Sequence, residues 1–227
     1  MGGAERKTVQ DKVELGEAGR RLYMSAGGAG VLALAGAFGI GLSMGDGLKQ
    51  FLHSYLVAFC FFLSLSLGAL FFVAVMRVTR GGWGVVVRRI GEIVASATPV
   101  FALLALVLVI PMFQGNHALY PWIDHDHMAH NPLLAKKLPY LNATFLAVRW
   151  VVYFAAWIFM ARFLLKRSVE QDASGDPKLT TRAEAFSAPA ILVYAITVTF
   201  FSFDALMSLA PEWYSTIFGV YFFSGCM

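Results

Sequence analysis

An acidic residue, Asp204, lies inside a long apolar run that ends at a turn containing Pro211 and Glu212. An ionised carboxylate near the centre of a bilayer costs about 2.5 to 3.5 kcal/mol on insertion scales, so it is expected to face protein, water or a cation. Arg149 is the only basic residue in the middle of an apolar stretch. We therefore expect a buried ion pair, because each charge reduces the desolvation cost of the other.

Asp204 also belongs to a row of residues spaced 3, 4, 3 and 4 apart, which places them on one face of a helix. The row consists of Tyr194, Thr197, Phe201, Asp204 and Ser208. Hydroxyl and carboxyl groups at successive depths are suited to a proton relay. The same groups can instead join helices by side-chain hydrogen bonds, so both interpretations stay open.

A second charged group, Arg88, Arg89 and Glu92, precedes another apolar run. The i,i+4 and i,i+3 spacings predict that both arginines neutralise the carboxylate locally. Because Arg side chains extend readily to a membrane interface, the group is typical of an anchored helix end.

The composition identifies an integral membrane protein. Of 227 residues, 58% are hydrophobic and only 14% are charged, against about 25% charged in soluble domains. The net charge of +4 lies between apolar runs rather than on one polar face, so no nucleic-acid partner is expected. Cys60 and Cys226 show no CxxC or CxxCH spacing, which argues against a disulfide framework, a zinc site, an iron–sulfur cluster or covalently bound haem.

The apolar runs predict an all-α, polytopic transmembrane helical bundle, since about 20 apolar residues cross a hydrocarbon core. Residues 1–21 are predicted to form a polar cytoplasmic tail, and residues 22–227 the membrane domain. The expected spans are about 22–42, 51–78, 85–113, 141–165, 183–210 and an incomplete 213–227. Residues 22–42 also resemble a signal peptide, but their length and the following spans favour a retained helix. Because the last run would cover only about 22 Å, we expect the chain to be the N-terminal part of a longer subunit.

Loop charges predict the orientation. Of the 18 Lys and Arg residues, Lys49, Lys136 and Lys137 lie on one side of the membrane, Arg149 lies within a span, and the others lie on the opposite side. The positive-inside rule then places the N-terminus in the cytoplasm. By helical rise, Arg149 is about 12 Å and Asp204 about 9 Å below the outer surface, so the pair can meet in the outer half of the bilayer.

The longest loop contains a histidine-rich segment that we do not expect to bind metal. Its candidate ligands are Asp124, His125, Asp126, His127 and His130. Their spacing fits no fixed tetrahedral motif. His53 is the only histidine in a span, which argues against a b-type haem. The residues indicate no catalytic group, cofactor site or metal site in this chain.

Several blocks of sequence resemble one family. They are SYLVAFCFFLSLSLGALFF, GGWGVVVRRIGE, LYPW, YLNATFLAVRWVVYFAAW and DALMSLAPEWYSTIFGVYFFSG, in this order over most of residues 54–225. Together they are similar to the ActF-type membrane subunits of bacterial alternative complex III, a quinol:cytochrome c oxidoreductase. Those subunits are related to the NrfD and PsrC type of quinone-associated membrane proteins.

The resemblance implies a ten-span subunit of the bacterial inner membrane, built from two four-helix bundles. It also implies an ActC-like membrane partner near which quinol is oxidised, an iron–sulfur subunit and haem c subunits. A proton pathway is discussed for this type of subunit, and Arg89, Glu92, Arg149 and Asp204 fall within the matching blocks. The expected function is that of a scaffold and candidate proton conduit in a respiratory chain, without a redox centre of its own. The alternatives are a secondary transporter with a buried Arg–Asp pair and an inert membrane anchor.

Overall fold

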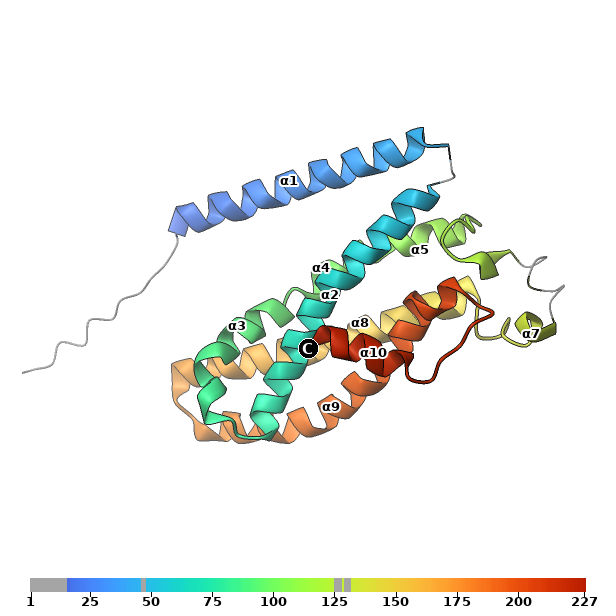
Figure 1. Cartoon of the computed structure of the whole chain (residues 1–227). Helices are drawn as coiled ribbons and strands as arrows, with labels where there is room; N and C mark the ends of the chain where they lie inside the picture. The colour runs from blue at the N-terminus through green and yellow to red at the C-terminus, as the bar shows by residue number, and fades with distance from the viewer. Residues whose placement is uncertain (1–15, 46–47, 125–127, 129–131) are drawn as a thin grey trace, which may run out of the picture. The chain divides into compact units, whose positions relative to one another are not determined.

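The chain is an all-α membrane protein. A computed structural model describes residues 16–45, 48–124, 128 and 132–227, and every regular element within these ranges is a helix (Figure 1). The chain divides into two compact units, Met1–Leu48 and Lys49–Met227. Each unit is described separately below.

The first unit contains one long helix, α1 (Gly16–Ser43). Its 28 residues rise about 42 Å, enough to cross a bilayer core. Residues 16–21, which were predicted to belong to a polar tail, form the first turns of α1. Glu17 stabilises this end, since it lies in the first turn and pairs with Arg21 at 3.7 Å. A negative charge there interacts favourably with the helix dipole. The rest of the predicted tail lies outside the described residues.

The second unit contains the other helices. They are α2 (Lys49–Val78), η1 (Gly82–Gly84), α3 (Val85–Ala95), α4 (Thr98–Leu104), α5 (Leu106–Phe113), η2 (Pro121–Ile123), α7 (Pro132–Ala135), α8 (Ala143–Ser174), α9 (Pro177–Ala205), η3 (Met207–Leu209) and α10 (Phe218–Cys226).

Five helical segments among the described residues are long and apolar enough to cross a membrane. They are Gly16–Ser43, Lys49–Val78, Gly82–Phe113, Ala143–Ser174 and Pro177–Leu209. Each of the first five predicted spans lies largely within one of these segments, so helices occur where those spans were expected. The sixth predicted span begins later than expected, because residues 213–217 are not helical and α10 starts only at Phe218.

The third span is not one continuous helix. Pro99 has no N–H with which to bond the Ala95 carbonyl, and the helix breaks between α3 and α4. Two buried hydroxyls replace the missing donor at the Ala95 carbonyl: Thr98 donates to it at 2.6 Å, and Ser66 on α2 donates to it at 3.4 Å. The break is therefore compensated by side chains, as a membrane interior requires.

Helices α8 and α9 form an antiparallel pair joined by a two-residue turn. Gly175 ends α8 with a left-handed backbone, φ +66°, which glycine adopts without steric cost. Asp176 then caps α9 by accepting a hydrogen bond from the Lys178 N–H at 2.9 Å. The connection predicted at 166–182 is thus mostly helical, and the apolar runs are shorter than the helices that contain them.

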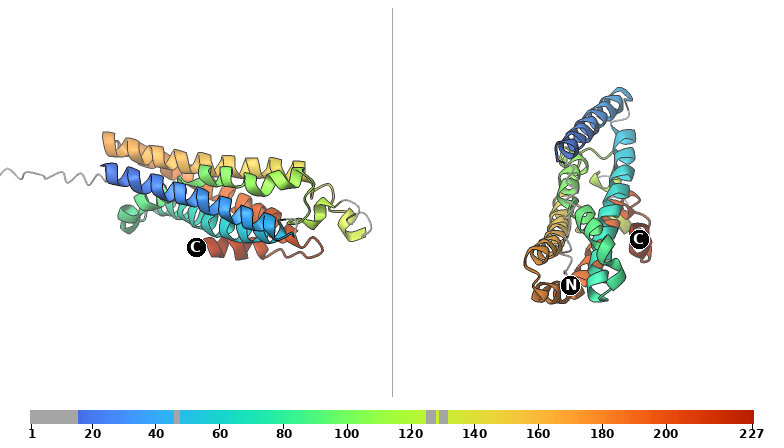
Figure 2. Two further views of the ribbon diagram at one scale, coloured as in Figure 1. Left: turned by 90° about the horizontal axis from the view of Figure 1, so that it is seen from above. Right: turned by 90° about the vertical axis from the view of Figure 1, so that its left-hand side faces the viewer.

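Helix α9 is central to the second unit. It packs against α8, α2 and α10, and Figure 2 shows α2, α8 and α9 running along one another. Fully buried aromatic side chains, including Trp157, Tyr194 and Phe201, fill the space between these helices. This packing fixes the face of α9 that carries Asp204.

Candidate functional site

The buried charges predicted on the fourth and fifth spans contact each other. Arg149 on α8 donates two hydrogen bonds to Asp204 on α9, from Nε to Oδ2 at 2.8 Å and from Nη2 to Oδ1 at 2.9 Å. The carboxylate is fully buried and the arginine is 8% exposed. This bidentate geometry is the strongest that an Arg–carboxylate pair adopts.

Two tyrosines complete the shell around the carboxylate. Tyr140 donates to Oδ1 and Tyr153 donates to Oδ2 of Asp204, both at 2.9 Å. Each carboxylate oxygen therefore accepts two hydrogen bonds. Burial, and then the negative charge of Asp204, raise the pKa of the Tyr140 hydroxyl, which keeps it a donor. Sequence reasoning missed both tyrosines, although the i,i+4 spacing of Arg149 and Tyr153 could have indicated the second.

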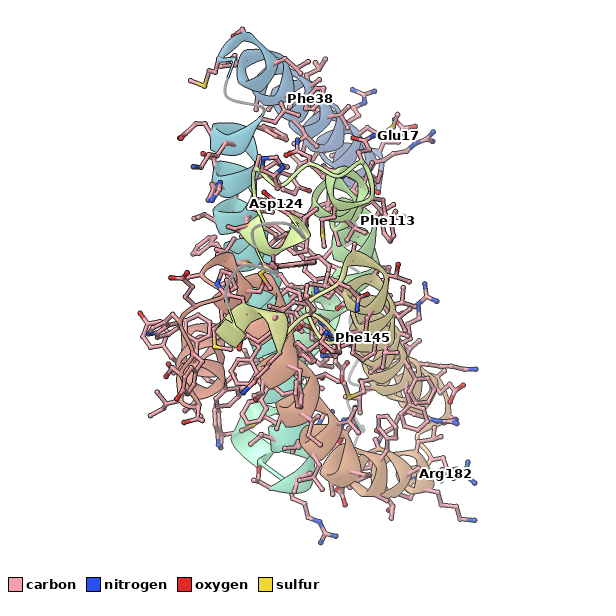
Figure 3. The ribbon with its side chains drawn as sticks, turned by 90° about the vertical axis from the view of Figure 1, so that its right-hand side faces the viewer. Glu17, Phe38, Phe113, Asp124, Phe145 and Arg182 are labelled. Carbon is pink, nitrogen blue, oxygen red and sulfur yellow. The ribbon has the colours of Figure 1, made fainter. Side chains whose placement is uncertain are left out.

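Arg149 is held from several directions. Its Nη1 donates to the Tyr140 carbonyl at 3.1 Å. The guanidinium lies over two aromatic rings, 3.9 Å from the Tyr140 centroid and 4.4 Å from that of Phe145. Phe145, labelled in Figure 3, is on the first turn of α8. Such cation–π contacts add to the ion pair and fix the orientation of the guanidinium.

The row of residues predicted along α9 is buried on one side of the helix, as its spacing implies. Tyr194, Thr197, Phe201 and Asp204 lie on α9, and Ser208 lies in the following η3. Ser208 donates to the Asp204 carbonyl at 2.6 Å. Thr197 donates to the Val193 carbonyl at 2.8 Å and accepts from Trp157 Nε1, also at 2.8 Å. Most hydroxyls of the row thus bond to nearby backbone.

An aromatic layer separates Asp204 from Thr197. The two residues are seven positions apart, about 10.5 Å along the helix. Phe201 fills this interval, with its ring centroid 5.3 Å from that of Trp150 and 5.4 Å from that of Trp157. The structure therefore brings Arg149 and Asp204 together, and it does not join them by hydrogen bonds to Thr197 or Tyr194 among the described residues.

Tyr194 is the member of the row that lies farthest along α9 from Asp204. Its hydroxyl is buried without a hydrogen-bond partner among the described residues. Its ring packs against Phe71 on α2 and against Phe223 on α10, with the centroids 5.4 and 6.3 Å apart. This environment is mainly apolar.

A second charged cluster surrounds Glu92. Arg88 and Arg89 lie 3.5 and 3.2 Å from its carboxylate oxygens, as predicted from spacing. The shortest contact is with Arg77 on α2, whose Nη2 donates to Oε1 at 3.0 Å. Arg77 and Glu92 are each 2% exposed, and Arg89 also pairs with Asp172 on α8. Arg77 was missed because its approach depends on the turn between α2 and α3, which no spacing rule defines.

A pocket of about 310 Å³ adjoins the Asp204 cluster. Tyr140 and Ser208 line it, and both bond to Asp204, one to its side chain and the other to its carbonyl. The carboxylate is thus one hydroxyl away from open space at this end of the helices.

The histidine-rich loop contributes little to the described part of the chain. His125, Asp126, His127 and His130 lie outside the described residues, while Asp124 is exposed. Among the residues that are described, no group of three or more His, Cys, Asp or Glu is arranged to hold a metal ion. His53 bonds locally among the described residues, where its Nδ1–H donates to the Lys49 carbonyl at 2.8 Å.

Comparison with known proteins assigns neither a family nor a relative to this chain. No family model matches the chain, and no curated protein is similar enough to it to count as a relative.

Proposed function

We propose that the chain is an integral membrane subunit of a quinol:cytochrome c oxidoreductase of the alternative complex III type. In this proposal it acts as a scaffold and proton conduit in the bacterial inner membrane, with its N-terminus in the cytoplasm. Haem c, iron–sulfur clusters and the quinol site belong to partner subunits, including an ActC-like membrane subunit. The proposal rests on the sequence blocks of the ActF type and on the position of Asp204.

The single observation that supports the conduit is the fully buried Asp204 carboxylate, which is hydrogen-bonded to a tyrosine that lines an open pocket. Intramembrane carboxylates are costly and are commonly retained for proton or ion movement. Tyr140 offers a route of one hydroxyl between the pocket and the carboxylate. The proposed conduit is therefore the outer part of a path, from Asp204 through Tyr140 to the outer surface.

The opposite part of the path is proposed to begin at Glu92. Its carboxylate is buried among arginines near the ends of α2 and α3, and Arg89 links it to the exposed Asp172. The aromatic layer around Phe201 lies between Thr197 and Asp204. Proton movement past this layer would require rearrangement or internal water.

The test is Asp204→Asn in the complete complex, measured as proton release per quinol oxidised and as turnover. We expect both to fall while the complex still assembles. Glu212→Gln is the matched control, because Glu212 is an exposed acid at the same end of α9. Normal proton release and normal turnover in Asp204→Asn would reject the conduit.

A specific observation favours a second candidate, the inert anchor. Asp204 already accepts four hydrogen bonds from three side chains, as a purely structural cluster would. In that case neutralising Arg149 and Asp204 together would lower stability and leave the activity of each assembled complex unchanged. The conduit predicts lower activity per assembled complex in the same double variant.

A further inference from the structure

The pocket beside Asp204 extends across the end of a membrane span. Phe203, Met207 and Leu141 form apolar walls, and Phe203 and Met207 belong to the last turns of the span Pro177–Leu209. Trp213 and Tyr214, which also line the pocket, follow just beyond that span. Aromatic residues in this position are typical of the level of lipid headgroups. One end of the pocket thus lies at hydrocarbon depth and the other at headgroup depth.

The polar end of the pocket is positively charged. Lys136 and Lys137 line it, and none of the described residues that line it is acidic. Lys137 donates to the Pro211 carbonyl at 2.5 Å and lies 5.8 Å from the centroid of the Tyr214 ring. An ammonium has three donors, and one of them bonds to the Pro211 carbonyl among the described residues, so two can serve another acceptor. Lys136 is exposed at the rim.

Positively charged residues are rare at this end of the second unit. Apart from Arg149, which is buried within α8, this end carries three Lys residues and no Arg, and two of the three line this one pocket. The third, Lys49, begins α2 and does not line the pocket. A local pair of cations on a side otherwise poor in positive charge indicates an anionic occupant.

We propose that this pocket binds one anionic phospholipid, with its phosphate between Lys136 and Lys137 and an acyl chain along Phe203 and Met207. Charge complementarity selects the phosphate, and the apolar walls select a lipid over a free ion. Tyr140 lines the same pocket, so a bound lipid covers the hydroxyl that leads to Asp204. The lipid would then limit the access of water to the buried pair. This inference does not depend on the proposed redox complex.

The test titrates phosphatidylglycerol into the delipidated full-length protein in detergent, with bound lipid counted by native mass spectrometry. Each lysine near an anionic phosphate contributes a modest, roughly additive attraction, so Lys136→Gln/Lys137→Gln is expected to weaken binding roughly 30-fold. Lys49→Gln is the matched control and should bind normally. Lys136→Arg/Lys137→Arg should retain binding because it preserves both charges. If the double Gln variant fails to fold, Lys136→Gln alone is expected to weaken binding about fivefold.

Three results would overturn the proposal. Phosphatidylcholine could bind as tightly as phosphatidylglycerol, which would remove the role of charge. The loss could be the same in Lys49→Gln, which would make it non-specific. Inorganic phosphate could bind at Lys136 and Lys137 while phosphatidylglycerol does not, which would identify a free ion as the ligand.

Discussion

At the scale of single residues, Asp204 is held by more donors than charge balance requires. Arg149 supplies two hydrogen bonds, and Tyr140 and Tyr153 supply one each. Removing one partner of such a pair leaves the other charge buried, which costs more than the pair itself contributes. The stability of the cluster should therefore be strongly non-additive.

Two substitutions test this non-additivity. Asp204→Leu and Arg149→Met each replace a charged side chain by an apolar one of similar size. Asp204→Leu alone should lower the free energy of unfolding by about 3 to 5 kcal/mol, because Arg149 keeps its charge without a counterion. The double variant should lose less than the sum of the two single variants. Thermal unfolding of the protein in detergent gives all four values, and additive losses would show that the two residues do not stabilise each other.

The environment of Tyr140 leads us to expect that the free energy of unfolding depends on pH. Its pKa is raised in the folded protein by burial and by Asp204, so its stabilising contribution is complete below the unfolded pKa of about 10 and is lost as the pH rises above that value. Tyr140→Phe should lower stability by about 1.5 kcal/mol at neutral pH, since a hydrogen bond to a charged group is lost. The difference between wild type and Tyr140→Phe should shrink above about pH 10. A difference that is constant with pH would contradict this explanation.

At the scale of the elements, the break in the third span depends on local substitutes for one missing N–H. Thr98 is fully buried and its hydroxyl bonds to the Ala95 carbonyl. Thr98→Val should therefore cost about 1 kcal/mol. Adding Pro99→Ala should recover part of this loss, because the substituted alanine can donate its own N–H to the same carbonyl. Ser96→Ala, which removes an exposed hydroxyl from the same turn, should change the unfolding free energy by less than about 0.5 kcal/mol. Unfolding in detergent measures each difference, and equal losses in Thr98→Val and Ser96→Ala would contradict the special role of Thr98.

The break in the third span is one of the features that could not be predicted from the sequence. Hydropathy predicted six spans, and the first five correspond to long apolar helical segments among the described residues. Helical rise with antiparallel packing predicted that Arg149 meets Asp204. Both predictions depend on regular geometry. The division of the third span, the late start of α10 at Phe218 and the position of Tyr140 depend on turns between the spans. Arg77 reaches Glu92 across such a turn, where Arg80 has a φ of +53°. Hydropathy carries no information about these turns.

At the scale of the whole molecule, the second unit has two chemically different ends. Arg80 pairs with Glu184 at 3.2 Å and Arg89 pairs with Asp172, so the turn before α3 and the turn between α8 and α9 lie at one arginine-rich end. Lys137 bonds to the Pro211 carbonyl, which places the long loop and the turn after α9 at the other. We propose from the positive-inside rule that the arginine-rich end faces the cytoplasm.

The proposed orientation can be tested with single cysteines in intact cells, after Cys60 and Cys226 are replaced by serine. His117 is exposed at the end of the second unit that contains Lys137, and Ala173 is exposed at the arginine-rich end, so His117→Cys and Ala173→Cys report on opposite ends. A membrane-impermeant maleimide should label position 117 in intact cells and position 173 only after the membrane is opened. The reverse pattern would invert the topology, and it would move both the lipid pocket and the Asp204 cluster to the cytoplasmic side. Labelling of both positions in intact cells would contradict a membrane-spanning α8, because residues 117 and 173 lie beyond opposite ends of its apolar segment.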